Sequence, residues 1–121
     1  MSRIRGKNTK IDLAMKSMLA DMKVKFEMYP KIPGNPDFVL ARKKIVIFCD
    51  GDFWHGYRYE EKKKPSTKFW RNKIERTMAR DRLVSARLRR EGWSVLRFWE
   101  HDIENKPEKC RNRIARKMSS G

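Results

Sequence analysis

The chain has 121 residues, which is enough for one domain and too few for two ordinary cores. Its 31 Lys and Arg outweigh its 15 Asp and Glu to give a formal net charge of +16, yet 39% of the residues are hydrophobic and 11% are aromatic, which argues against a disordered chain. No run of 18 apolar residues occurs, which excludes a membrane-spanning helix, and because the basic first residues lack an apolar stretch we expect no signal peptide.

The start of the sequence predicts a basic arm, a helix and a strand. Residues 1–8 are basic and carry no apolar pattern. A helix is expected from Thr9, because apolar residues then recur at spacings of three and four and Asp12 stands three residues after Thr9, as in a capping box. Residues 23–29 alternate between apolar and polar side chains, which predicts a half-buried strand before a turn rich in Pro and Gly.

The middle of the sequence predicts a hairpin followed by a long connection. Two apolar runs, 38–41 and 45–49, flank the polar residues 42–44 and favour a tight β-hairpin. The segment 50–67 contains aromatic residues and a run of lysines. It is longer than most loops, and loops of that length are typically functional or disordered.

A long helix, an apolar strand and a final helix are expected in the remainder. The long helix covers residues 69–91 and ends at Gly92, since glycine commonly terminates helices. The strand, 93–99, is mostly apolar and is therefore predicted to be central in the sheet, and the last helix covers 107–118 with Pro in its first turn. The order α-β-β-β-α-β-α predicts an α/β fold in which helices flank a mixed sheet of about four strands.

The excess of positive charge predicts that the partner is a phosphate backbone. Each Lys or Arg that meets a phosphate releases a counterion, so binding weakens as the salt concentration rises. An anionic membrane surface is disfavoured, because the basic residues are spread along the whole chain instead of lying on one amphipathic helix. Two cysteines are too few for a disulfide framework, which fits the reducing cytoplasm.

The hairpin brings two carboxylates together as a candidate metal site. With a turn centred between Lys43 and Lys44, the numbers of paired residues add up to 87, so that Asp37 faces Asp50. Facing Cβ atoms lie about 5 Å apart, and carboxylates that close repel each other unless a cation or a proton separates them. Mg²⁺ is the expected cation, because it prefers oxygen ligands. The alternative is that both aspartates are ordinary turn residues at strand ends.

Further candidates lie on the long helix and in the long connection. Asp81 falls on the helix face that packs on the sheet, where a carboxylate needs a metal, a His or a cation; a structural ion pair with Arg is the alternative. His55 follows Asp50 closely and, as a neutral imidazole, can take a proton from water. Its neighbours Phe53 and Trp54 can stack on bases or wedge between base pairs, or else anchor the loop in the core.

Four segments of the chain resemble the very-short-patch repair (Vsr) endonucleases. They are NPDFVL (35–40), FCDGDFWHG (48–56), KFWRNKIERTMARD (68–81) and REGWSVLRFWE (90–100), and their order and spacing match the family over nearly the whole chain. The resemblance implies a fold related to the restriction-endonuclease core. It also implies Mg²⁺-dependent cleavage of one strand of duplex DNA, near a T:G mismatch in the well-studied members.

The resemblance also implies roles for single residues. Asp37 matches the metal-binding aspartate, and Cys49 matches a position whose backbone carbonyl binds the metal. His55 matches the catalytic histidine and Asp81 a carboxylate that orients it, while Asp12 matches a glutamate at the edge of the active site. Three aromatic residues match a wedge that enters DNA beside the mismatch: Phe53, Trp54 and Trp70. The last of these also falls on the sheet-facing side of the predicted helix, so both positions stay open for it.

The chain departs from the family pattern at two places. Asp50 stands where the family often has a second histidine. The residues that match the family's structural zinc site cannot build a tetrahedral site of cysteine and histidine; they are Asp52, Tyr57, Tyr59 and His101. We therefore expect no structural zinc, and irregular spacing disfavours a zinc site assembled from Cys49, His55, His101 and Cys110.

These features predict one domain, residues 1–121, that acts as a monomeric, nucleoid-associated DNA endonuclease and nicks one strand with Mg²⁺. Basic side chains of the arm and the loop are expected to hold double-stranded DNA: Arg3, Arg5, Lys7, Lys62, Lys63 and Lys64. A non-catalytic nucleic-acid-binding module would explain the charge and the aromatics equally well, but not the three aspartates. The nuclease domain of a homing-type endonuclease and an RNA-cleaving enzyme are further alternatives.

Overall fold

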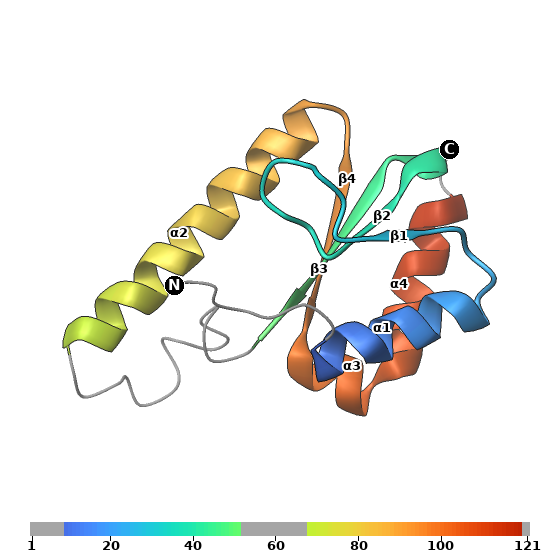
Figure 1. Ribbon diagram of the computed structural model, residues 1–121, viewed down its shortest axis with the longest axis horizontal. Helices are drawn as coiled ribbons and strands as arrows, with labels where there is room; N and C mark the ends of the chain where they lie inside the picture. Colours follow the sequence, from blue (N-terminus) through green and yellow to red (C-terminus); the bar gives the residue numbers. More distant parts are fainter. Residues whose placement is uncertain (1–8, 52–67, 120–121) are drawn as a thin grey trace.

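The computed structural model describes residues 9–51 and 68–119, which form a mixed four-stranded sheet with helices on both faces (Figure 1). The strands are β1 (Glu27–Met28), β2 (Phe38–Leu40), β3 (Ile45–Asp50) and β4 (Ser94–Trp99), in the order β1-β2-β3-β4. The first two pairings are antiparallel and the pairing of β3 with β4 is parallel. The predicted α/β architecture is therefore confirmed.

The helices divide the core into two layers, one on each face of the sheet. Among the described helices, α2 (Lys68–Arg90) lies on one face, whereas α1 (Lys10–Asp21), α3 (Glu100–Asn105) and α4 (Pro107–Ser119) lie on the other (Figure 1). The core under α2 is small and consists of Val39, Val46, Phe48, Leu88 and Val95. The larger core on the other face includes Met15, Leu19, Phe38, Ile47, Cys49 and Ile114.

Local signals placed the three long helices correctly. The side chain of Thr9 accepts a hydrogen bond from the backbone N–H of Asp12 at 3.4 Å and so caps α1 as predicted. Helix α2 ends where Gly92 adopts a positive φ of 97°, and the N–H of Trp93 then donates to the carbonyl of Leu88 at 3.0 Å. Helix α4 begins at Pro107, as expected.

Two predictions about strand extent and position are wrong. The segment 23–29 contributes only the two residues of β1, because most of it lies outside the ladder with β2. Strand β4 pairs with β3 alone among the described strands and is thus at an edge instead of the centre. The strand is apolar because helices cover both faces of the sheet there. An edge strand that is covered on both faces is as apolar as a central one, so composition alone does not show the position of a strand in the sheet.

The predicted register of the hairpin is also wrong. Residues Ala41–Lys43 form a short 3₁₀ turn and Lys44 closes it in the left-handed conformation with a φ of 53°, so the connection is longer than a tight turn. Phe38 pairs with Ile47, and paired numbers therefore add up to 85 instead of 87. Asp37 and Asp50 consequently do not face each other across the strands.

The described residues contain one further helix, α3, that the sequence did not predict. It has six residues and follows β4 directly, so it is too short to show an apolar period. None of the helices formed by residues 9–51 and 68–119 is long and apolar enough to cross a lipid bilayer.

Candidate active site

Asp37 lies at the end of the β2–β3 ladder, and its main chain forms hydrogen bonds to residues on both sides. Its N–H donates to the carbonyl of Ile47 at 2.9 Å, and its carbonyl accepts from the N–H of Tyr29 at 2.8 Å. The carboxylate oxygen Oδ2 then accepts the N–H of Cys49 at 2.7 Å. Because only 4% of Asp37 is exposed, this hydrogen bond fixes a carboxylate that water scarcely reaches.

Helix α1 brings a second carboxylate to the same place. Asp12 is fully buried in the first turn of α1, and the hydroxyl of Tyr29 donates to its Oδ2 at 2.8 Å. Tyr29 therefore links the two acids, since its main chain binds Asp37 and its side chain binds Asp12. One ligand atom from each of Asp12, Asp37 and Cys49 lies within 4.8 Å of the other two.

This donor set suits a hard divalent cation. Two buried carboxylates at this separation repel each other unless a cation or a proton lies between them. Carboxylate oxygens are the ligands that Mg²⁺ prefers, whereas a thiol suits softer metals. The N–H of Cys49 points to the β2 side of β3, and in an extended strand the carbonyl of the same residue points to that side too.

Asp50 is not part of this group. Consecutive side chains of a strand point to opposite faces, so that Cys49 packs in the core beneath α1 while Asp50 faces α2. There its Oδ1 and Oδ2 accept from Nη1 of Arg97 at 3.1 and 3.2 Å. The predicted Asp37–Asp50 pair is thus replaced by a pairing of Asp37 with Asp12.

Arg97 is the centre of a polar network under α2 that the sequence reasoning missed. Its Nε donates to the hydroxyl of Ser85 at 2.9 Å, its guanidinium lies 4.0 Å from the centre of the Phe48 ring, and Nη1 lies 3.8 Å from Oδ1 of Asp81. The alternative of an Asp81–Arg ion pair is therefore observed. The available signal was a lone arginine in the otherwise apolar strand 93–99, since a charge at such a position needs a partner.

Aromatic side chains are exposed at the start of α2. Trp70 is 39% exposed and Phe69 is 62% exposed, and their rings meet edge to face with centroids 5.0 Å apart. Of the two positions left open for Trp70, the surface position is the observed one. Nine predicted site residues lie outside the described residues: His55, Phe53, Trp54, Arg3, Arg5, Lys7, Lys62, Lys63 and Lys64.

Three members of the alternative zinc site lie within the described residues: Cys49, His101 and Cys110. Cys110 is buried in the larger core, and burial, followed by the nearby charge of Asp102, raises the pKa of its thiol. The side chain of His101 lies 3.4 Å from a carboxylate oxygen of Asp102.

Comparison with a solved structure first gives the fold. The catalytic domain of the homing endonuclease I-Bth0305I superposes on this chain with a TM-score of 0.64, covering 91% of this chain and 94% of that domain at 20% identity. Such a low identity establishes the fold alone. The chain thus has a restriction-endonuclease-like fold, in which acidic residues gather at one end of a mixed sheet.

Sequence comparison then gives the family. The family model described as DNA mismatch endonuclease Vsr matches residues 1–61. The chain is 37% identical over 114 residues to the type II nicking enzyme V.NmeDIP of Neisseria meningitidis serogroup C, covering 91% of this chain and 77% of that protein. It is 37% identical over 103 residues to the DNA mismatch endonuclease Vsr of Escherichia coli K12, covering 83% and 66%. The chain belongs to the Vsr endonuclease family.

A third relative matches a similar share of the chain. The type II nicking enzyme V.HpaIIP of Haemophilus parainfluenzae is 38% identical over 109 residues, which cover 87% of this chain and 77% of that protein. The family resemblance inferred from four short segments is therefore confirmed over most of the chain.

Proposed function

We propose that this chain is a Mg²⁺-dependent endonuclease that nicks one strand of duplex DNA. The observation that carries the proposal is the convergence of Asp12 and Asp37, two buried carboxylates from distant parts of the sequence, at one end of the sheet. Membership of the Vsr family and similarity to enzymes named for nicking support the same activity.

Asp12, Asp37 and the main-chain carbonyl of Cys49 would hold the divalent ion. Bound there, Mg²⁺ would supply positive charge next to the scissile phosphate and the departing 3′ oxygen. The chain's own contribution is to hold the two carboxylates apart from water and in fixed rotamers. Tyr29 does this for Asp12, and the Cys49 N–H does it for Asp37.

His55 is the proposed base and Asp81 its orienting partner. A neutral imidazole takes the proton from the attacking water, and a carboxylate on its other nitrogen fixes the tautomer. The position of Asp81 depends on Arg97, which contacts both its carboxylate and its main-chain carbonyl. Asp50 acts through Arg97 as a positioning residue, because it binds the same guanidinium.

The surface that meets DNA includes the start of α2. Trp70 forms the wedge together with Phe53 and Trp54, and Phe69 extends the exposed aromatic surface. Arg3, Arg5, Lys7 and the lysines of the 62–64 run bind the phosphate backbone.

A panel of duplex substrates tests this function. Strand nicking is measured in Mg²⁺ on labelled duplexes with a T:G mismatch, with other mismatches and with full complementarity, and EDTA is added to a parallel set. The proposal predicts EDTA-sensitive cleavage of one strand, fastest on the T:G duplex. A salt-sensitive gel shift without cleavage on any duplex would instead identify a non-catalytic binding module. A labelled RNA of the same sequence is included in the panel, and faster cleavage of this RNA would contradict the assignment to DNA.

A further inference from the structure

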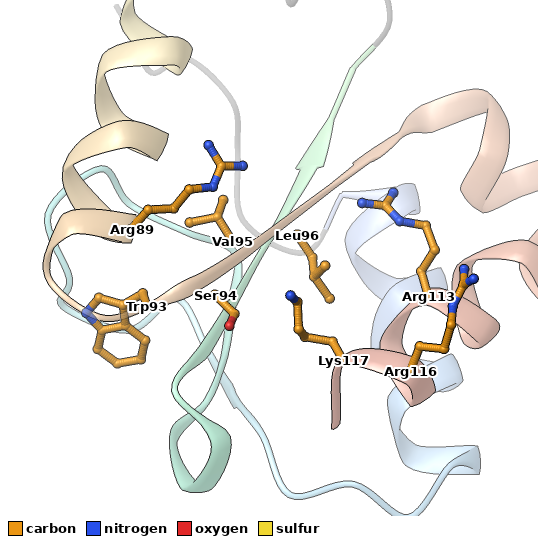
Figure 2. Close-up of a pocket in the computed structure, with 8 residues that line it drawn as sticks. All are labelled: Arg89, Trp93, Ser94, Val95, Leu96, Arg113, Arg116 and Lys117. Carbon is orange, nitrogen blue, oxygen red and sulfur yellow. The ribbon is translucent and has the colours of Figure 1, made fainter. Parts of the chain in front are cut away.

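A basic groove of about 620 Å³ runs along the outer edge of β4 (Figure 2). Its floor is the first half of β4 and its walls are the ends of α2 and α4. The residues that line it are Arg89, Trp93, Ser94, Val95, Leu96, Arg113, Arg116 and Lys117. The groove thus combines an apolar floor with four cationic side chains on its two sides (Figure 2).

The floor of the groove presents main-chain hydrogen-bonding groups. The N–H of Ser94 donates to the carbonyl of Lys44 and therefore points toward β3. Successive residues of a strand point these groups in opposite directions, so Val95 directs its N–H and carbonyl to the open edge. Arg97 has the same orientation, and its carbonyl accepts Nη1 of Arg113 at 2.9 Å. That contact closes the second half of the edge, whereas no described residue pairs with the main chain of Val95 on the outer side of β4.

The groove lies away from the candidate active site. Phe98 pairs with Cys49 of the candidate active site, and Val95 lies three residues before Phe98 in β4. The groove and the site are therefore about 10 Å apart along the strand. Along α2 the separation is larger, since Arg89 follows the exposed Trp70 by 19 positions, or about 28 Å of helix.

We propose that this groove binds an extended acidic segment of a partner protein, which adds to β4 as a fifth strand. A strand satisfies the N–H and the carbonyl of Val95 together, which an isolated phosphate cannot do. An alternating segment would direct its acidic side chains to one face, toward the three cations of the α4 wall, and its apolar side chains to the other face, over Val95.

Two other occupants fit less well. In a second copy of the same chain, the arginines of one groove would face those of the other, and a net charge of +16 on each copy opposes this pairing. Duplex DNA matches the charge of the walls but offers no extended main chain to the floor.

The test uses the full-length protein and two synthetic peptides of equal charge. One peptide alternates Glu and Val over seven residues, and the other replaces each Val by Pro, which removes main-chain donors and prevents strand pairing. Binding is followed through the amide NMR signals of Val95 and Arg97, in the presence of excess duplex DNA. The Glu–Val peptide is expected to shift both signals saturably and to bind at least 10-fold more tightly than the Glu–Pro peptide.

Two charge-reversal variants complete the test. Arg116→Glu changes the α4 wall of the groove, whereas Arg90→Glu makes the same charge change at an exposed residue that does not line it. Arg116→Glu is expected to weaken Glu–Val binding at least 5-fold and Arg90→Glu less than 2-fold, with DNA nicking unchanged in both. Equal binding of the two peptides, equal effects of the two variants, or displacement of the peptide from Val95 by DNA would each overturn the proposal.

Discussion

Arg97 supplies a positive charge next to the two carboxylates on the α2 side of the site. Its guanidinium binds Asp50 and approaches Asp81, and the exposed fractions of these side chains are 22% for Arg97, 7% for Asp50 and 19% for Asp81. Both carboxylates therefore interact with the same guanidinium in a region that water reaches poorly.

Replacing Arg97 by Met is expected to lower the free energy of unfolding by about 2–4 kcal/mol. The methionine still packs against Phe48, but it leaves Asp50 and Asp81 without the guanidinium. Urea denaturation measures the loss. The matched control is Arg87→Met, which breaks a pair that is 59% and 44% exposed and should change stability by less than about 0.5 kcal/mol. An equal effect of the two substitutions would contradict this role of Arg97.

Single residues of the site could be predicted only where a motif identified them. Asp12, Asp37 and Cys49 follow from the family resemblance, and the structure brings all three together. The Asp37–Asp50 pair failed because it rested on an assumed turn, and the left-handed conformation of Lys44 shifts the register by two residues. The role of Tyr29 has no sequence signal, since it requires that the 23–29 segment and α1 be placed in space.

At the scale of elements, long helices were predictable and short strands were not. Helices α1, α2 and α4 carry an apolar period together with an N-terminal capping residue, a terminal glycine or an initial proline. Strand β1 has two residues and β2 has three, so their limits depend on pairing partners that the sequence does not name. For the same reason, the edge position of β4 could not be derived from its composition.

The turn before β2 depends on Gly34, where α2 packs against it. Gly34 has a φ of 93°, and a Cβ placed there would collide with the Val84 side chain. Gly34→Ala is therefore expected to cost about 2–4 kcal/mol from backbone strain and overpacking together. Adding Val84→Ala should recover only the overpacking part.

The control for this prediction is Gly51→Ala. The nearest atom to a Cβ at Gly51 is Oε1 of Glu100 at 3.8 Å, which is an ordinary contact, so a loss below about 1 kcal/mol is expected in urea denaturation. If Gly34→Ala were as stable as Gly51→Ala, the close packing of the turn on α2 would be refuted.

At the scale of the whole molecule, a basic protein carries its few buried acids at one end of the sheet. In the proposed function, the charge of +16 would attract the DNA backbone and the buried carboxylates would hold the ion next to it. This combination predicts binding that is strong at low salt and weakens steeply. Six phosphate contacts or more would reduce the affinity for a duplex by at least about 1000-fold between 50 and 200 mM salt.

Fluorescence anisotropy with a labelled duplex, in EDTA so that no cleavage occurs, measures this dependence. A linear fall of the logarithm of the binding constant with the logarithm of salt concentration is the expected result. Affinity that changed less than about 5-fold over that range would contradict a phosphate-dominated interface.

The most direct measurement is Mg²⁺-dependent nicking of supercoiled plasmid by the Asp37→Asn variant. Asparagine keeps an oxygen that can accept the Cys49 N–H, so the variant should give a cooperative thermal melt, but it lacks the charge that holds the ion. Loss of a residue that merely supports a metal ligand costs about 10–100-fold in activity, so loss of the ligand charge should lower nicking at least about 100-fold. A folded Asp37→Asn protein that nicks within about 10-fold of the unaltered chain, and stays sensitive to EDTA, would contradict the site.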